Sequence, residues 1–451
     1  MVANGVSYPK RKKVGSGTDG RTEVSLRAIA REHLLQASFI HIGLNEAVMP
    51  STRRQLLATT GLAVATAFGG RFAGAQTAVS SSANDWPMAR YDAAGTASHP
   101  SGTGPKDEVE IVWSHESTAW FRGTTTPIRA GDTIYAAGRG LLALDTEDGE
   151  RRFGASGPYQ SSPARVSASL YDTDTLAVTA PTGVFGLNAG GGLDVPMRDE
   201  PVGLQRWRES SGETGFFGAP DHATPVVADG TIYTALPGTN SIAALDADNG
   251  SVQWRSTHHE DDNVSASFNR PAVRDDLVVA SNWPGKVTAY HADDGTREWQ
   301  REIDVQTVLA PVATASGVVV QTREDVRLLD LADGTTLWRA EFDANVTDSV
   351  PAVADGTVFA VDELGSMHAL DLASGEVLWT TPFDGKTAPV VADGVVYAVR
   401  SGFELVGVDA TSGDRLFTYR PSQVPLSAPI VGDGRLYAAN RKRVIALEET
   451  A

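Results

Sequence analysis

The chain repeats one phrase eight times between residue 127 and its end. Each copy opens with a proline, continues through short apolar segments separated by turns, and leads towards an aromatic residue. The clearest copies run from Pro351 to Trp379 and from Pro389 to Phe417. A repeat of about forty residues with four short strands is typical of a β-propeller blade. The opening prolines are Pro127, Pro163, Pro225, Pro271, Pro311, Pro351, Pro389 and Pro429.

Only seven of the eight copies reach a closing aromatic residue, because the last one stops after its third strand. An unassigned closing segment, Glu108 to Trp113, precedes the first copy. We therefore predict an all-β fold, an eight-bladed propeller of four-stranded antiparallel blades, closed by pairing of the N-terminal strand with the C-terminal blade. The aromatic residues expected to dock neighbouring blades are Trp113, Phe153, Trp207, Trp254, Trp299, Trp338, Trp379 and Phe417.

The repeat also contains two turn sequences between its strands. Ala-Asp-Gly recurs at 228–230, 354–356 and 392–394, where glycine tolerates positive φ and aspartate bonds to the neighbouring backbone. A second pattern, Asp-x-x-x-Gly, as in Asp371 to Gly375, predicts the turn between the third and fourth strands.

The segments ALDLASGEVLW at 369–379 and ALDADNGSVQW at 244–254 resemble the PQQ-like repeat propellers. This family includes the outer-membrane assembly lipoprotein BamB and the quinoprotein dehydrogenases. The resemblance covers residues 84–451, and the segment Asp85 to Asp92 looks like the family's usual lead-in. It implies that the recurring tryptophan ties blades together. It implies less about activity, because one fold hosts many functions.

The N-terminal part indicates export. Arg53 and Arg54 precede an apolar run and a small-residue cleavage site, which together predict a twin-arginine signal peptide over 49–76. Residues 1–48 are interpreted as a start codon assigned too early, or else as a disordered basic extension. A lead-in segment over 77–107 and the propeller over 108–451 complete the predicted organisation. We expect an extracellular or cell-surface protein with no transmembrane segment in its mature chain.

Acidic residues outnumber basic ones by 56 to 38, which gives a net charge of −18. After the predicted signal only four lysines remain: Lys106, Lys286, Lys386 and Lys442. Such a surface is typical of proteins that work in high salt, and it indicates a halophilic archaeon. It argues against nucleic acid as a partner. The chain has no cysteine, and therefore no disulfide and no lipid-modified cysteine of the kind that anchors BamB.

In a propeller, the fourth-to-first and second-to-third strand connections emerge on one face, and binding residues tend to lie in such loops. We predict a binding site at this channel mouth and no metal site. The run His258-His-Glu-Asp-Asp is interpreted as a solvated acidic loop, with a loosely held Ca²⁺ as the alternative. The candidate binding residues are Trp120, His222, His258, His259, Asn269, Arg270, Asn282, Trp283, Arg323, Asp362, Arg400 and Arg441.

Two functional hypotheses stay open. The first is an exported binding or scaffold protein, a monomer without intrinsic catalysis, that takes a protein partner or a small molecule at the channel mouth. The alternative is a PQQ-dependent alcohol or sugar dehydrogenase, in which PQQ and Ca²⁺ would lie near Arg270, Asn282, Trp283 and Asp362. The best-known alcohol dehydrogenases of the family that this chain resembles have a vicinal cysteine pair and large insertions. This chain has neither. No hydrolase motif is present, so catalytic residues are not assigned.

Overall fold

The structure is a computed structural model that describes residues 83–117, 125–194, 196, 201–210, 223–257, 268–304, 307–342, 349–385, 387–420 and 425–451. The predicted signal peptide and the 1–48 extension lie outside these residues. The described residues form 33 strands and contain no helix, which confirms the all-β prediction for this part of the chain. A helix able to cross a membrane is accordingly not found in these ranges.

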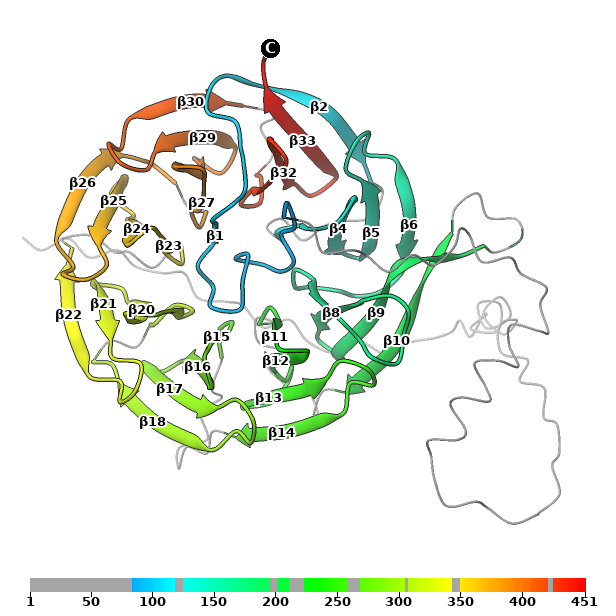
Figure 1. The fold of residues 1–451 in the computed structure, drawn as a ribbon, viewed down its shortest axis with the longest axis horizontal. Coiled ribbons are helices and arrows are strands. Elements are labelled where there is room, and N and C mark those ends of the chain that lie inside the picture. Colours follow the sequence, from blue (N-terminus) through cyan, green and yellow to red (C-terminus); the bar gives the residue numbers. More distant parts are fainter. Residues whose placement is uncertain are drawn as a thin grey trace, which may run out of the picture. The chain divides into compact units, whose positions relative to one another are not determined.

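Four of the sheets contain four antiparallel strands each, in the order in which the chain makes them. They follow one another around a ring, with the first strand of each sheet innermost (Figure 1). Their strands are β11 (Val226–Ala228), β12 (Thr231–Ala235), β13 (Ser241–Asp246), β14 (Val252–Thr257), β15 (Ala272–Arg274), β16 (Leu277–Asn282), β17 (Lys286–His291), β18 (Arg297–Glu302), β19 (Val312–Thr314), β20 (Gly317–Gln321), β21 (Asp325–Leu329), β22 (Thr336–Glu341), β23 (Ala352–Ala354), β24 (Thr357–Val361), β25 (Ser366–Asp371) and β26 (Val377–Pro382).

The largest sheet has eight strands and consists of two antiparallel halves. The halves join through a parallel contact between their outer strands, where Val202 stands opposite Gly154. The first half contains β3 (Ile128–Ala130), β4 (Thr133–Gly138), β5 (Gly140–Asp145) and β6 (Arg151–Ala155). The second half contains β7 (Ala164–Val166), β8 (Thr175–Ala180), β9 (Gly183–Leu193) and β10 (Val202–Ser210).

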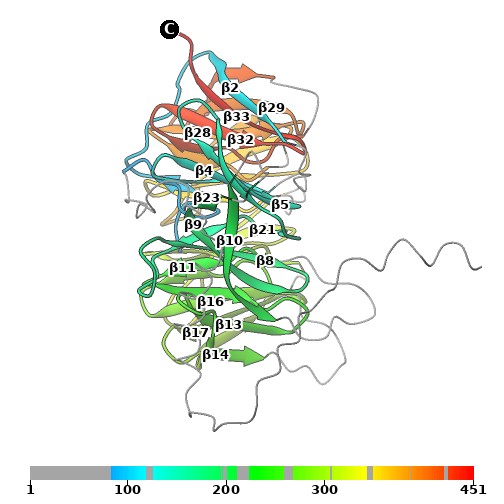
Figure 2. The ribbon, with the colours of Figure 1, turned by 90° about the vertical axis from the view of Figure 1, so that its right-hand side faces the viewer.

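Both remaining sheets combine strands from distant parts of the chain. Strand β1 (Ser98–His99) pairs in parallel with β27 (Val390–Ala392), which continues into β28 (Val395–Arg400), β29 (Glu404–Asp409) and β30 (Arg415–Tyr419). Strand β2 (Val109–Glu116) is the outer strand of the sheet formed by β31 (Ile430–Gly432), β32 (Arg435–Ala439) and β33 (Arg443–Glu449). It pairs antiparallel with β33, and Trp113 stands opposite Ala446. Figure 2 shows β2, β33 and β32 side by side.

The Ala-Asp-Gly segments form the tight turns that the sequence predicts. At 392–394, Asp393 has a φ of 49° and Gly394 a φ of 76°. Positive φ at both central residues is the mark of a type I′ turn, whose twist matches that of the flanking strands. Each such turn joins the inner strand of a sheet to the second strand. These turns lie together on one face of the ring, which we call the turn face; we call the opposite face the loop face.

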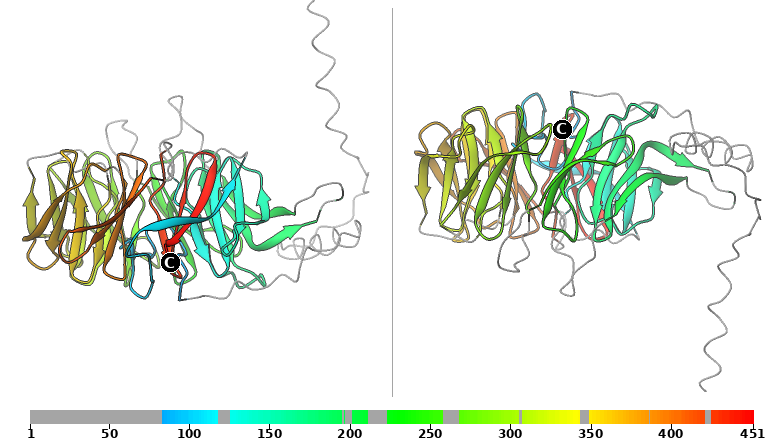
Figure 3. Two further views of the ribbon diagram at one scale, coloured as in Figure 1. Left: turned by 90° about the horizontal axis from the view of Figure 1, so that it is seen from above. Right: turned by 90° about the horizontal axis from the view of Figure 1, so that it is seen from below.

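Nearly all residues of the second and third strands of each sheet are buried, and most of them are apolar. In β28 the five residues from Val395 to Val399 are all buried, and in β25 Met367, Ala369 and Leu370 are fully buried. The outer strands are half exposed, as in β26, where Leu378 is 57% exposed. Seen from above and below, the sheets stand side by side (Figure 3). Apolar residues of neighbouring sheets share one core, as Val226 and Tyr233 do with Val273 and Tyr290.

Candidate functional site

The lead-in segment lies across the inner ends of the sheets on the turn face (Figure 1). Its carbonyl groups accept hydrogen bonds from the N–H groups of successive inner strands. One segment therefore ties together sheets from most of the ring and covers its centre on this side. The donors and their acceptors are Arg129 with Trp86 (3.0 Å), Arg165 with Pro87 (2.8 Å), Val273 with Ala93 (2.8 Å), Ala313 with Ala94 (2.9 Å), Val353 with Thr96 (2.9 Å) and Val391 with Ala97 (2.8 Å).

Arg90 reaches from the lead-in towards the loop face. Its guanidinium donates to the carbonyls of Val350 at 3.2 Å and Pro389 at 3.5 Å, and also to the carbonyl of Pro351. These carbonyls stand at the starts of two neighbouring inner strands. Burial lowers the pKa of Arg90 to about 9, and repulsion from the Arg270 guanidinium adds to the effect. The side chain thus holds the centre of the ring through its own hydrogen bonds.

Arg270 fixes the lead-in from the side of the ring. It donates to the carbonyl of Asp92 at 2.6 Å and to that of Pro271 at 3.1 Å. It lies beneath Gly95, where a Cβ atom would come within 2.7 Å of the guanidinium. Burial lowers its pKa to about 10. Its Nε atom is buried without a hydrogen-bond partner among the described residues.

Asn269, Asn282 and Trp283 lie at the loop-face end of the sheet formed by β15–β18. The Asn269 amide donates to the carbonyl of Val308 in the next sheet at 2.8 Å. The Asn282 amide donates to the Trp283 carbonyl at 3.0 Å, while its Oδ1 atom is buried without a partner in the described ranges. The Trp283–Pro284 peptide bond is cis, and the Trp283 side chain is 42% exposed. Trp283 is thus the most exposed of these three side chains.

Asp362 belongs to a hydrogen-bonded series within its own sheet. Its Oδ2 atom lies 2.9 Å from Nε2 of His368, and Nδ1 of His368 lies 3.0 Å from the Thr380 hydroxyl. Its Oδ1 atom accepts the N–H of Ser366 at 2.9 Å. Both carboxylate oxygens are thus engaged across neighbouring strands.

The predicted arginines differ in their surroundings. Arg400 pairs with Glu404 at 2.7 Å, and Arg420 pairs with the same carboxylate. The hydrogen bond from Arg400, followed by that from Arg420, lowers the pKa of Glu404. Arg323 and Arg441 are exposed at loop-face connections. The other candidates, Trp120, His222, His258 and His259, lie outside the described residues, so the structure does not place them.

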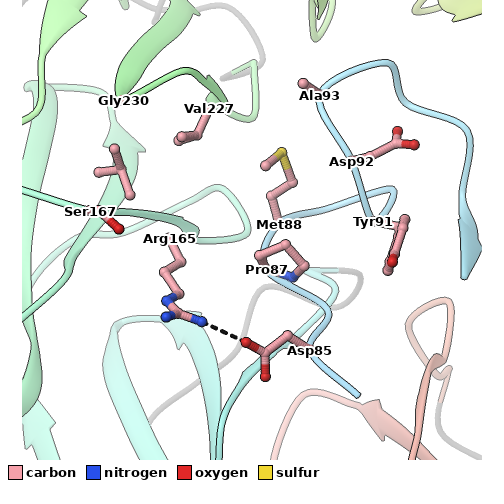
Figure 4. Close-up of a pocket in the computed structure, with 11 residues that line it drawn as sticks. Asp85, Pro87, Met88, Tyr91, Asp92, Ala93, Arg165, Ser167, Val227 and Gly230 are labelled. Atoms are coloured by element: carbon pink, nitrogen blue, oxygen red, sulfur yellow. Dashed lines mark hydrogen bonds and ion pairs between the residues drawn. The ribbon is translucent and has the colours of Figure 1, made fainter. Parts of the chain in front are cut away.

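A pocket that the sequence did not predict lies on the turn face, beside the lead-in. Its volume is about 510 Å³. Figure 4 shows Met88 and Val227 near its middle, with Arg165 and Asp85 joined below them. The Asp85–Asp92 segment, which supplies part of its lining, resembles a lead-in in the sequence, and that resemblance does not predict a pocket. The described part of the chain contains no group of three or more His, Cys, Asp or Glu side chains arranged to hold a metal ion.

This arrangement of inner strands, docked sheets and lead-in defines a repeat-propeller architecture. The chain belongs to the family described as outer membrane protein assembly factor BamB, whose model matches residues 198–321 and 322–450. The BamB of Salmonella typhimurium is 27% identical over 200 residues, which are 42% of this chain and 49% of that protein. The BamB of Yersinia pestis is 28% identical over 195 residues, 39% and 48% of the two chains. This chain thus spans about half the length of these curated relatives.

Solved structures extend the fold comparison. The BamB of Moraxella catarrhalis superposes with a TM-score of 0.57 at 14% identity, over 76% of this chain and all of that one. A quinohemoprotein alcohol dehydrogenase from Pseudomonas putida superposes with a TM-score of 0.60 at 12% identity, over 81% and 80%. A europium-containing methanol dehydrogenase gives a TM-score of 0.62 at 11% identity, over 81% and 98%. At these identities the likeness concerns the fold alone.

Among the residues that the structure describes, those that the resemblance would assign to PQQ do not form an open site. Of the four that the resemblance would assign to the quinone and its cation, Arg270 and Asn282 come from one sheet and Asp362 from another that is not its neighbour. Arg270 is engaged with the lead-in, and both carboxylate oxygens of Asp362 accept hydrogen bonds inside the protein. A quinone dehydrogenase needs a carboxylate free to hold the cation or to take a proton. No catalytic step follows from these side chains.

Proposed function

We propose that this chain is an exported, monomeric binding or scaffold protein of the BamB-like repeat-propeller type, without intrinsic catalysis. The observation that supports it best is the contrast among the loop-face candidates. Arg270, Asp362 and Arg400 are committed to contacts within the chain, whereas Trp283 is exposed on a rigid sheet end. An exposed aromatic side chain on a fixed scaffold is suited to contact another molecule.

We further propose that the ring has eight blades and that the N-terminal strand closes it. The count treats the halves of the eight-stranded sheet as two blades. Support comes from the antiparallel register of β2 on β33. Trp113 adds to it, because its indole N–H donates to the carbonyl of Thr146 in the first half-sheet at 3.0 Å.

A photocrosslinking side chain placed at Trp283 tests the binding proposal. Its matched control is the same side chain at Leu378, which is also exposed but lies on an outer strand. We expect adducts with one cell-surface partner, or with one small ligand, from position 283 and none from position 378. Equal labelling from both positions, or no adduct from position 283, would contradict the proposal.

Export by the twin-arginine route is part of the same proposal. Residues 49–76 carry the signal, and the acidic balance of the remaining chain suits a salty exterior. The double variant Arg53→Lys, Arg54→Lys should leave the protein in the cytoplasm. Its unimpaired secretion would refute this part of the account.

A PQQ-dependent alcohol or sugar dehydrogenase is the second candidate. It is favoured by the fold similarity to two quinone-type dehydrogenases and by the buried, unpaired Oδ1 atom of Asn282 among the described residues. Saturable substrate oxidation in the presence of PQQ and Ca²⁺ would decide for it.

A further inference from the structure

His99 is a buried histidine in the last part of the lead-in, and its side chain is only 1% exposed. Among the described residues, neither Nδ1 nor Nε2 of its ring has a hydrogen-bond partner. Buried polar atoms in folded proteins are nearly always paired. His291 and His368 differ from it, since their Nε2 atoms lie 2.8 and 2.9 Å from carboxylate oxygens. The unpaired ring of His99 is therefore an exception within this chain.

The packing around the imidazole shields it from water. The centroid of the Tyr91 ring lies 4.6 Å from that of His99, and the centroid of the Trp86 ring lies 6.1 Å from it. Gly102 approaches so closely that a Cβ atom on it would lie 2.4 Å from the His99 ring. Such surroundings hold a neutral imidazole well, because it is a flat and largely apolar ring, but they offer nothing to a charged one.

The nearest charges also disfavour protonation of His99. Burial first, and then the charge of Arg129 on β3, lower the pKa of His99 below its usual value of 6.5. The Asp85 carboxylate and the carbonyl of His99 itself act in the opposite direction and are weaker. Asp85 already accepts the N–H of Gly131 at 2.7 Å and pairs with Arg165 at 2.6 Å. Its charge is therefore largely used elsewhere.

The other ionisable groups on the adjoining elements are uncharged or already paired. Burial raises the pKa of Tyr91, so its phenol stays neutral when acid is added. Asp433, on the turn after β31, pairs with Arg129 at 3.6 Å. Asp393, directly after β27, pairs with Lys106 at 2.9 Å. An imidazolium here would meet a guanidinium, while each of these carboxylates already has a cation to bind.

His99 lies where the lead-in is attached to the ring. Strand β1 pairs in parallel with β27, and His99 stands opposite Ala392 (Figure 1). The carbonyl of Ala97 accepts the N–H of Val391 at 2.8 Å, which is the last of the contacts between lead-in carbonyls and inner strands. The first of these contacts is made by Trp86, whose ring packs near that of His99. A charge on His99 therefore acts where the two ends of the lead-in meet.

We propose that His99 makes the attachment of the lead-in sensitive to acid: protonation of its buried ring separates β1 from β27, while the sheets of the ring stay folded. The charged imidazole moves from between Tyr91 and Gly102 into water, and the adjoining backbone moves with it. This movement uncovers the inner end of the sheet that begins with β27 on the turn face. It takes place on the face opposite to Trp283, so it does not depend on the loop-face proposal.

Amide hydrogen exchange of the purified protein tests this inference at the Val391 N–H. Exchange would be followed between about pH 7 and 4.5 and corrected for its intrinsic pH dependence, which gives the opening constant. If opening lets His99 take up one proton, the opening constant should rise by up to about tenfold per pH unit below 6.5. The N–H of Ala313, bound to Ala94 at 2.9 Å in the middle of the lead-in, should not follow this rise. An opening constant at Val391 that does not depend on pH, or a rise that Ala313 shares, would overturn the proposal.

His99→Phe removes the titrating group but keeps an aromatic ring against Tyr91. Opening at Val391 should then lose its acid dependence, and its persistence in this variant would contradict the assignment to His99. His291→Phe is the matched control, because the His291 side chain is 41% exposed and pairs with Glu298 outside the lead-in; it should keep the wild-type dependence.

A direct measurement on the wild type keeps the inference testable even if His99→Phe does not fold. The ¹⁵N signals of the His99 imidazole report whether its ring carries one proton or two. They should show a neutral ring at about pH 6 while the Val391 N–H is still protected, because the closed state excludes the second proton. A charged His99 ring in the protected state would contradict the proposal.

Discussion

The indole N–H of Trp379 donates to the backbone carbonyl of Ala410 in the neighbouring sheet at 3.0 Å. The ring lies against Gly413 of the same turn, where a Cβ atom would come within 2.7 Å of it. One turn thus supplies the carbonyl that accepts the indole N–H and a glycine, without a side chain, against which the ring packs. The same contact joins five further pairs, Trp113 with Thr146, Trp207 with Ala247, Trp254 with Ala292, Trp299 with Leu331 and Trp338 with Leu372.

Trp379→Phe tests the hydrogen bond in this contact. It keeps an aromatic ring but leaves the Ala410 carbonyl without its donor. We expect the free energy of unfolding to fall by about 1 kcal/mol, measured by chemical denaturation in high salt. The neighbouring Leu378→Ala is the control: Leu378 is 57% exposed, so its change should stay within about 0.5 kcal/mol. Equal effects of the two variants would contradict the assigned role.

Gly413→Ala tests the close approach of the ring. Gly413 has a φ of 76°, and the added methyl group would meet the Trp379 ring. Gly394 has the same φ of 76° but nothing within 4 Å of its Cβ position. Gly394→Ala should therefore cost only the left-handed backbone penalty, about 1–2 kcal/mol. Gly413→Ala should cost clearly more in the same unfolding measurement, and an equal cost would show that the ring contact does not matter.

The docking could be predicted from the sequence, because each repeat contains both partners of the contact, a turn with glycine and a tryptophan. The two phenylalanines also have a structural reason. The sheet next to Phe417 takes its outer strand from β2, so it has no turn between third and fourth strands. The sheet next to Phe153 has the long β9–β10 connection, and its corresponding carbonyl, that of Ala189, accepts the Tyr135 hydroxyl at 2.6 Å. Phenylalanine has no N–H to donate, so neither position makes the indole hydrogen bond of the six tryptophans.

The path of the lead-in could not be predicted, because no periodicity marks which backbone groups it will bind. Arg270 and Asp362 lie at sheet ends, and their partners are a carbonyl of Asp92 and the side chain of His368. These contacts join residues through the folded backbone rather than through sequence spacing. Loop position alone therefore selected both engaged and exposed side chains as candidates.

Arg90→Met tests the anchoring of the lead-in. The substitution removes a buried guanidinium that donates to carbonyls of Val350 and Pro389 and leaves these acceptors unpaired. We expect the free energy of unfolding to fall by about 3 kcal/mol, the scale of losing charge-assisted hydrogen bonds. Arg323→Met, at an exposed loop position, should have little effect. A similar small effect for Arg90→Met would show that the lead-in is held by other contacts.

The turn aspartates predict how stability depends on acid. Hydrogen bonds from the Ser374 hydroxyl and N–H lower the pKa of the Asp371 carboxyl below its usual range near 3.8. The lowered pKa means that the folded state holds this proton less tightly than the unfolded state. Its contribution to stability is therefore complete above about pH 4 and is lost as the pH falls through the folded pKa. Urea unfolding of wild type and Ser374→Ala between pH 2 and 6 should show a shallower acid dependence in the variant; an unchanged dependence would contradict the assignment.

The proposal of a binding protein without catalysis is tested most directly by dye-linked oxidation. The purified mature chain would be incubated in high salt with PQQ and Ca²⁺, then supplied with ethanol or glucose and an electron-accepting dye. The account predicts no dye reduction above that of the cofactor alone, and no change in Asp362→Asn. Saturable turnover by the wild type that disappears in Asp362→Asn would contradict it and establish a quinone-dependent dehydrogenase.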